Sequence, residues 1–157
     1  MRGISTFLWF EDQAHEAARF YVSVFPNSRI IGEDTFHDQR PGKEQDVPVV
    51  SFELDGTPFS AINGGPMFSF TPAISFVVSC EDQAEVDYYW ERLTAGGEES
   101  MCGWLIDRFG VSWQVTPTEL ESLIGGPDPE GAARATAAML EMRKIDITAL
   151  RAAYAGD

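Results

Sequence analysis

The sequence is poor in the residues that build metal clusters, disulfide frameworks and surfaces for polyanions. Its 157 residues include 2 cysteines and 2 histidines, and 11 basic residues stand against 25 acidic ones, for a formal net charge of -14. Cys80 and Cys102 form neither a metal-type pair nor a multi-bridge framework, so we expect both to be reduced. Nucleic acids and anionic lipids are bound by clustered lysine and arginine, so we expect no nucleic-acid or membrane partner. The acidity is consistent either with a cationic ligand or with an ordinary solvated surface.

Long apolar runs are also missing. None approaches the roughly 20 residues that a membrane-spanning helix requires. The first ten residues, MRGISTFLWF, lack the apolar stretch and small-residue cleavage site of a secretory signal, so we expect a soluble, cytoplasmic protein. With 44% hydrophobic residues, a chain of this length can form a single domain over residues 1–157 with its own core.

What the sequence does contain is an internal repeat. Residues 4–14, ISTFLWFEDQA, and residues 74–84, ISFVVSCEDQA, share six identities in eleven places at a constant offset of 70. Each copy is a short apolar run, then Asp12 or Asp82 as a helix N-cap, then a helical segment. The repeat therefore predicts a strand followed by a helix, twice.

Three further strands are expected after each helix, which makes two tandem βαβββ modules. Module one covers about 1–66, module two about 67–117, and a helical tail about 118–157. In module one the polar stretch 37–46 reads as a loop, and Asp55-Gly56 reads as the turn of a hairpin. The fold class is therefore α+β. Spacings of three and four predict the buried helix faces, which are Ala14, Ala17, Ala18, Tyr21, Val24 and Phe25 in the first helix and Ala84, Tyr88, Trp90 and Leu93 in the second.

Four stretches carry a family resemblance: EAARFYVSVFPNSRI, LDGTPFSAINGGP, CGWLIDRFGVSWQVTP and AMLEMRKIDITALRAAY. Together with the module order they resemble the PhnB-like branch of the vicinal oxygen chelate superfamily, whose members often carry the label of a demethylubiquinone methyltransferase. The superfamily includes glyoxalase I, extradiol dioxygenases and bleomycin-resistance proteins. The resemblance implies a glyoxalase-like open barrel with a U-shaped sheet. It also implies a homodimer whose modules and C-terminal helices pack across subunits.

In metal-dependent members of the superfamily, the first and last strands of each module supply His or Glu ligands. The resemblance places these positions at Gly3 or Ile4 and at Ala73 on the first strands, and at Ser60 and Gln114 on the last strands. None of these residues is a strong ligand for a divalent metal. We therefore expect no metal and no cofactor.

The two histidines do not supply the missing metal ligands. His15 falls on the first predicted helix and His37 in the polar loop, away from the predicted cavity. Each is read as a surface residue in preference to a ligand.

Strand alternation sorts the side chains that face the cavity, because successive residues of a strand point to opposite faces. The predicted cavity face carries small polar, aliphatic and aromatic side chains: Ser5, Phe7, Trp9, Ser60, Ile62, Ser75, Val77, Ser79, Ser112 and Gln114. Trp104 is either a ring that stacks on a ligand or part of the core. Asn63 either presents its amide at the cavity mouth or makes the turn between the modules. Such a surface suits an organic ligand held by shape and a few hydrogen bonds.

Residues for catalysis are harder to find. No histidine on the predicted cavity face could activate a serine or cysteine. Cys102 is either reactive, beside Arg108 or a helix end, or a small buried hydrophobe. Asp107 is either a general base or a cap for the turn before Gly110, and Gln114 is the third weak candidate.

These residues favour a metal-free protein that binds a small molecule. One alternative is an enzyme of the same fold that acts on a carbonyl or aromatic substrate. Another is a methyltransferase, but S-adenosylmethionine is usually held at a glycine-rich turn between a strand and a helix. The glycine pairs of this chain, 64–65, 96–97 and 125–126, do not occupy such a turn.

Overall fold

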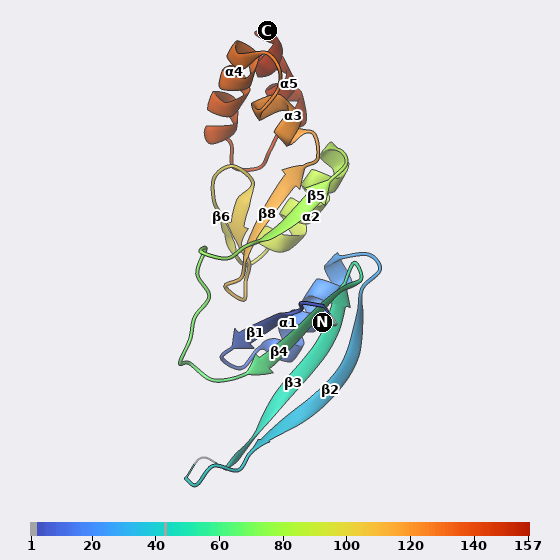
Figure 1. Cartoon of the computed structure of the whole chain (residues 1–157), viewed down its shortest axis with the longest axis vertical. Coiled ribbons are helices and arrows are strands. Elements are labelled where there is room, and N and C mark those ends of the chain that lie inside the picture. The colour runs from blue at the N-terminus through green and yellow to red at the C-terminus, as the bar shows by residue number, and fades with distance from the viewer. Residues whose placement is uncertain (1–2, 43) are drawn as a thin grey trace. The chain divides into compact units, whose positions relative to one another are not determined.

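The computed structural model describes residues 3–42 and 44–157 and divides the chain into two compact units. Unit 1 is Met1–Ser69 and unit 2 is Phe70–Asp157. Each unit contains a four-stranded sheet with a helix after its first strand, and unit 2 also contains the helical tail (Figure 1). The predicted α+β class with two βαβββ modules and C-terminal helices is confirmed.

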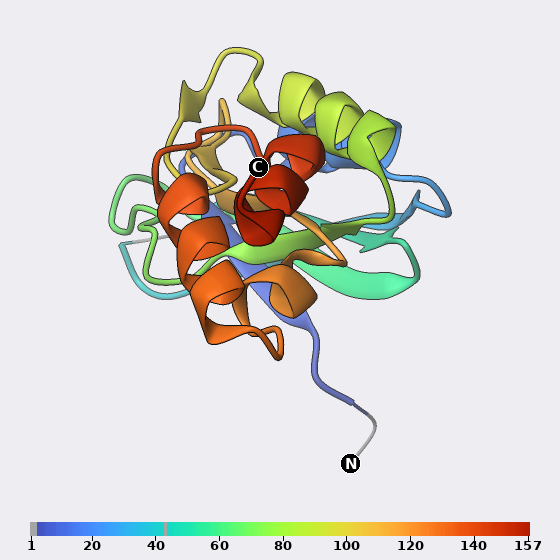
Figure 2. The ribbon, with the colours of Figure 1, turned by 90° about the horizontal axis from the view of Figure 1, so that it is seen from above.

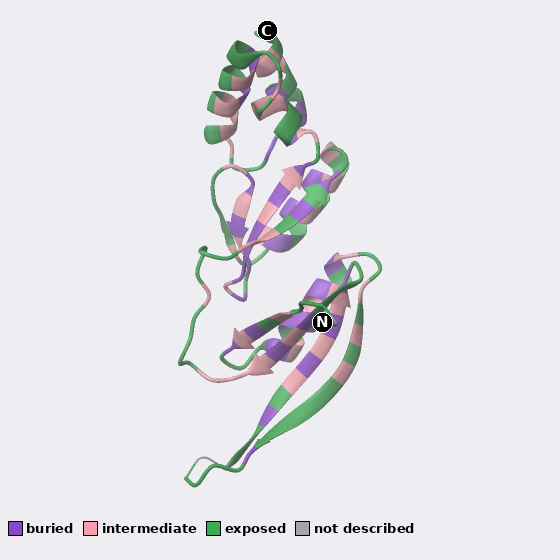
Figure 3. Ribbon diagram, in the orientation of Figure 1, coloured by how far each residue is buried: buried purple, intermediate pink, exposed green. Residues whose placement is uncertain are grey.

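Unit 1 runs in the order β1 (Thr6–Phe10), α1 (Ala14–Val24), β2 (Arg29–Asp38), β3 (Gln45–Leu54) and β4 (Thr57–Asn63). Its sheet has the order β1-β4-β3-β2, with β1 parallel to β4 and the other neighbours antiparallel. The predicted buried face of α1 is confirmed from Ala14 to Val24, although Phe25 is only half-buried. Burial alternates along β3, so one face of the sheet packs against α1 (Figure 3).

Unit 2 repeats this order with β5 (Phe76–Cys80), α2 (Gln83–Thr94), β6 (Glu98–Glu99), β7 (Trp104–Ile106) and β8 (Ser112–Pro117). Its sheet has the order β5-β8-β7-β6, and β5 is parallel to β8. Val78, Cys80, Leu105, Trp113 and Val115 are buried on the face that meets α2.

The tail forms α3 (Leu120–Ile124), α4 (Pro129–Leu140) and α5 (Ile147–Ala155), which lie together when unit 2 is seen from above (Figure 2). Leu120, Ile145 and Leu150 form a small buried core there. The side chain of Asp146 accepts a hydrogen bond from the N–H of Ala149 and so caps α5. In the described part of the chain, no helix is both long and apolar enough to cross a membrane.

The turn between β3 and β4 has the geometry expected from its sequence. Asp55 and Gly56 both have positive φ, 45° and 74°, and Leu54 pairs with Thr57 across them. This is the arrangement that two-residue hairpins favour.

The hairpin of β2 and β3 is longer than predicted. The stretch 37–46 does not form a loop throughout, because His37 pairs with Asp46 and Asp38 with Gln45. Hydrophilic side chains at the end of a hairpin stay in water while their backbones pair, so polarity alone is a poor guide to where a strand ends. His37 therefore lies on a strand and not in a loop.

The N-cap of α1 is also not the predicted one. Asp12 does not cap the helix; Gln13 occupies the N-cap position without a side-chain bond. Instead, the side-chain oxygen of Asn63 accepts a hydrogen bond of 2.8 Å from the N–H of Ala14. The pairing of Phe10 with Asn63 brings the end of β4 to the start of α1, so this cap comes from far along the sequence. In α2 the predicted cap is confirmed, since Asp82 accepts from the N–H of Glu85 at 2.9 Å.

The buried face of α2 differs in part from the prediction. Ala84 and Tyr88 are exposed, whereas Val86, Trp90 and Leu93 are buried. These three positions recur at spacings of four and three, and they form the stripe that packs against β8, β5 and β7.

Candidate functional site

Strand pairing places Ser60 and Gln114 at equivalent positions in the two units. Phe7 pairs with Ser60 across β1 and β4, and Val77 pairs with Gln114 across β5 and β8. Phe7 and Val77 are separated by the same 70 residues as the two copies of the repeat. The pairing thus fixes the register that the sequence alone leaves open.

In unit 2, several of the predicted residues gather on the sheet face away from α2. Val77, Gln114 and Trp104 form one row across β5, β8 and β7. The side-chain amide of Gln114 donates a hydrogen bond of 2.9 Å to the hydroxyl of Ser75, and Ser112 precedes Gln114 by two residues on the same strand. We call these five residues (Ser75, Val77, Trp104, Ser112 and Gln114) the Gln114 face.

Two polar groups of the Gln114 face have no partner in the described part of the chain. The hydroxyl of Ser112 is buried, with the residue 2% exposed, and makes no hydrogen bond. The indole N–H of Trp104 also has none, whereas Trp9 donates to the carbonyl of Gly65, Trp90 to Glu99 and Trp113 to Asp107. A buried hydroxyl left unpaired costs about 1–3 kcal/mol, so a ligand whose polar group reaches Ser112 would recover this cost. The half-buried indole N–H of Trp104 bears no such cost.

On the equivalent face of unit 1, the chain covers Trp9 with its own segment at Gly64-Gly65. Trp9 bonds the carbonyl of Gly65 at 2.9 Å, and its ring meets the ring of Phe68 edge-on at 5.1 Å between centroids. A Cβ atom on Gly64 would lie 2.2 Å from the Trp9 ring, so the backbone passes directly over the indole. The hydroxyl of Ser60 lies 3.4 Å from that of Ser51.

Three other predicted residues of unit 1 are placed as follows. Phe7 is 61% exposed, Ile62 is half-buried beside Trp9 in the register of β1 and β4, and Ser5 is exposed just before β1. The Gly64-Gly65 pair is the sequence signal for a backbone that approaches an aromatic ring closely.

The carboxylate of Asp107 is buried and fully engaged in hydrogen bonds within its own hairpin. It is 3% exposed, and one carboxylate oxygen accepts from the backbone N–H groups of Phe109 (2.8 Å) and Val111 (3.0 Å). The other oxygen accepts from the indole N–H of Trp113 at 2.8 Å. The carboxylate thus holds the turn between β7 and β8, which is the second of the two roles that the sequence allowed.

The two cysteines differ in burial. Cys80 is fully buried, and burial, with smaller contributions from Glu85 and Asp82, raises its pKa to about 12. Cys102 is half-buried with a positive φ of 59°, and its backbone N–H bonds the carbonyl of Met142. Asn63, which caps α1, has its side-chain oxygen engaged in unit 1.

The residues on the helix-free faces do not fit the metal site of the superfamily. Ser60 and Gln114 stand at the last-strand positions, and neutral hydroxyl and amide groups are weak ligands. Glu53 on β3 is the nearby carboxylate, and it is bonded to Arg29 at 3.0 Å. Across residues 3–42 and 44–157, no group of three or more His, Cys, Asp or Glu side chains could hold a metal ion.

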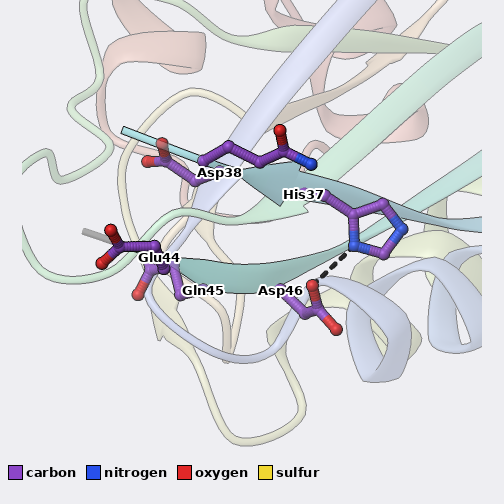
Figure 4. A pocket seen from close by; sticks show the side chains of 6 residues that line it. His37, Asp38, Glu44, Gln45 and Asp46 are labelled. Carbon is purple, nitrogen blue, oxygen red and sulfur yellow. Dashed lines mark hydrogen bonds and ion pairs between the residues drawn. The ribbon is translucent and has the colours of Figure 1, made fainter. Parts of the chain in front are cut away.

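A concavity lies at the end of the β2–β3 hairpin, in the stretch that was predicted to be a loop (Figure 4). Its volume is about 460 Å³, and it is lined by His37, Asp38, Gln39, Glu44, Gln45 and Asp46. The carboxylate of Asp46 lies 2.6 Å from His37, and that of Asp38 lies 2.5 Å from Arg40. Since the Asp38 carboxylate is paired with Arg40 and the Asp46 carboxylate is bonded to the ring of His37, we assign no ligand to this concavity.

Comparison with known proteins places these observations in a family. The family model described as 3-demethylubiquinone-9 3-methyltransferase matches residues 2–116. Among solved structures, a putative 3-demethylubiquinone-9 3-methyltransferase, PhnB protein, from Bacillus cereus is 37% identical over 74% of this chain and 100% of its own, with a TM-score of 0.65. The fosfomycin resistance protein FosX from Listeria monocytogenes is 21% identical over 77% of this chain and 94% of its own, with a TM-score of 0.52, which shows a shared fold alone. No curated protein is similar enough to count as a match.

Proposed function

The chain belongs to the family described as 3-demethylubiquinone-9 3-methyltransferase, within the vicinal oxygen chelate superfamily, and from this premise we propose that it binds a small uncharged organic molecule, without a metal, on the Gln114 face of unit 2. One observation carries the proposal. Trp104 and the buried Ser112 present polar groups with no partner among the described residues, on the same sheet face as Gln114.

The chemistry of this face indicates the class of ligand. Ser75, Val77, Trp104, Ser112 and Gln114 carry no charge, so an ion would lose its hydration there without gaining a counter-charge. The ring of Trp104 suits a flat aromatic or quinone-like molecule, and its N–H, the Ser112 hydroxyl and the Gln114 amide suit carbonyl or hydroxyl substituents. A phenol, quinol or quinone satisfies all three requirements.

Methyl transfer, which the family description names, is not the function that we propose. In both units the turn from the first strand into the helix has no glycine: residues 11–13 are Glu-Asp-Gln, and residues 81–82 are Glu-Asp. The close approach of a cofactor to the backbone, which such a glycine permits, is therefore absent at these two turns. Calorimetric titration with S-adenosylmethionine should give no saturable heat, and saturable binding would overturn this conclusion in favour of a methyltransferase.

The binding proposal is tested with the reduced head group of ubiquinone, a dimethoxy-methyl-hydroquinone, kept reduced so that it does not modify cysteine. We expect saturable binding by calorimetry that survives dialysis against EDTA. Ser112→Ala and Trp104→Phe each remove one hydrogen bond to the ligand and should weaken binding about tenfold.

The matched control is Ser122→Ala, which removes an exposed hydroxyl from α3 outside the Gln114 face and should leave the affinity unchanged. Two results would contradict the proposal. One is unchanged affinity in both Ser112→Ala and Trp104→Phe, and the other is binding that disappears with EDTA and returns with a divalent metal.

A further inference from the structure

The tail begins where the match to the family model ends, and it is built into unit 2. The family model ends at residue 116, and the Bacillus cereus chain is matched in full while covering 74% of this one. Leu120, Ile145 and Leu150 of the tail are buried, with Ile145 at 0% exposure. The tail is therefore part of the packed structure of unit 2.

Residues 142–147, which connect α4 to α5, dock on the loop that leads into β7. We call them the docking segment. The N–H of Cys102 donates to the carbonyl of Met142, and the N–H of Gly103 donates to the carbonyl of Arg143, both at 2.7 Å. The docking segment therefore holds the backbone of the two residues directly before Trp104.

Gln83, at the start of α2, fixes the docking segment from the other side. Its side-chain amide donates to the carbonyl of Ile145 at 3.0 Å and accepts from the N–H of Ile147 at 2.9 Å. Close by, Lys144 forms an ion pair of 2.6 Å with Asp87, whose pKa is lowered by hydrogen bonds from Lys144 and Gln83. The Gln83 side chain thus satisfies one backbone group before Asp146 and one after it. Neither group is bonded within a strand or a helix among the described residues.

Gly103 connects this docking to the Gln114 face. Its carbonyl accepts from the N–H of Val115, the residue after Gln114, at 2.8 Å. Its φ is 81°, and a Cβ atom there would lie 2.6 Å from the carbonyl oxygen of Val115 and 3.2 Å from the side chain of Ile145. Gly103 is therefore held between β8 and the docking segment. Because it directly precedes Trp104, its position determines where the backbone of Trp104 begins.

The internal repeat supplies a matched comparison within the molecule. Gln13 occupies the position equivalent to Gln83 in the same four-residue sequence, Glu-Asp-Gln-Ala. Its side chain is exposed and makes no hydrogen bond to the described residues, and unit 1 has no tail. The role of Gln83 therefore comes from the tail and not from the start of the helix.

We propose that the docking segment is a positioning element, anchored by Gln83, that holds Trp104 in the orientation needed for the ligand on the Gln114 face. This inference rests on the proposed function, because it assigns a role to the tail in that same site. Gln83 and the docking segment do not touch the ligand; they act through Gly103 and Trp104.

The test uses the full chain labelled with fluorotryptophan, whose four fluorine resonances are assigned by single Trp→Phe variants. Gln83→Met keeps the length of the side chain but removes both hydrogen bonds to the docking segment. It should shift and broaden the Trp104 resonance, leave that of Trp9 unchanged, and weaken binding of the hydroquinone probe about tenfold. Gln13→Met, the matched control, should change neither the Trp104 resonance nor the affinity.

A milder pair of variants keeps the test decisive if Gln83→Met fails to fold. Lys144→Ala removes the ion pair with Asp87 beside Gln83, whereas Arg151→Ala removes the pair with Glu119 elsewhere in the tail. We expect the Trp104 resonance to move in Lys144→Ala and not in Arg151→Ala. The inference is overturned if hydrogen exchange at Cys102 and Gly103 speeds up in a variant while the Trp104 resonance stays in place.

The fluorine spectra need no ligand, so they separate this inference from the proposed function. A Trp104 resonance that moves while the probe fails to bind to any form of the protein removes the assigned binding role, and with it the inference. A probe that binds equally well to Gln83→Met and to the unchanged chain removes the positioning role and leaves the proposed function standing.

Discussion

At the scale of single residues, the hydrogen bonds of the Asp107 carboxylate decide what this group can do. Its two oxygens accept from two backbone N–H groups and one indole N–H inside the β7–β8 hairpin. A carboxylate held by three donors in this way serves as a fixed acceptor for the turn. Its contribution is to the stability of unit 2.

Asp107→Asn tests this role. The amide can keep one acceptor oxygen for the backbone but presents a donor to the indole of Trp113, so a buried bond of 2.8 Å is lost. We expect the free energy of unfolding to fall by about 1–3 kcal/mol in urea melts. Asp34→Asn, at an exposed position of β2, should change it by less than about 0.5 kcal/mol. An Asp107→Asn variant that keeps its stability but loses function would show that Asp107 acts in the function and not in the stability of the fold.

Cys80 should make the protein sensitive to alkaline pH. Burial raises the pKa of its thiol from 9.0 to about 12, so the folded protein holds this proton more tightly than the unfolded chain does. The contribution of Cys80 to stability is therefore complete below pH 9 and is lost as the pH rises toward 12.

Two measurements check the thiols. The difference between the unfolding midpoints of the unchanged chain and of Cys80→Ala should become smaller as the pH rises above 9. At neutral pH a thiol reagent should modify one cysteine of the folded protein, and Cys102→Ser should abolish this fast reaction, because Cys102 is only half-buried. Rapid modification of Cys80 in the folded protein would show that this residue is not buried.

At the scale of elements, α1 begins at a cap that lies 49 residues from it in the sequence. Asn63→Ala removes the acceptor for the N–H of Ala14 and should lower the free energy of unfolding by about 1 kcal/mol. Asp12→Ala is the matched control and should have little effect, because Asp12 does not cap the helix. The opposite ranking in urea melts would restore the cap expected from the sequence.

The sequence was sufficient for the elements whose signals are local. The Asp55-Gly56 turn, the apolar face of α1 and the cap at Asp82 each depend on residues within one or two turns of chain, and all three are found in the structure. The Asn63 cap depends on a strand pairing between distant segments, and the buried face of α2 depends on which side the sheet approaches. Contacts between segments that are far apart in the sequence cannot be predicted from a short window of it.

The features of the candidate site also divide into those that depend on local sequence and those that depend on distant contacts. Alternation was enough to assign Val77 and Gln114 to one face of the sheet, where strand pairing sets them side by side, because it needs only the strand period. Neither the difference between Trp104 and the other tryptophans nor the unpaired hydroxyl of Ser112 could be predicted, since both depend on whether a distant partner arrives.

At the scale of the whole molecule, we expect two copies of the chain to associate, as the resemblance to the superfamily implies. Light scattering during gel filtration should give a mass of twice 17.4 kDa. Exposed apolar side chains such as Ile31 and Phe36 on β2 and Leu140 on α4 lose contact with water when they are covered, which favours association. A mass of 17.4 kDa at every concentration would contradict this expectation.

The equal placement of Gln13 and Gln83 has an evolutionary consequence. Tandem duplication of an ancestral module gives each side chain a second copy, and the two copies are then free to take different duties. Gln13 shows that the glutamine is compatible with a module that carries no extension, and Gln83 shows the same residue bonded to one. The residue that anchors the tail thus belongs to the repeat itself, so the attachment at Gln83 uses a side chain that both modules carry.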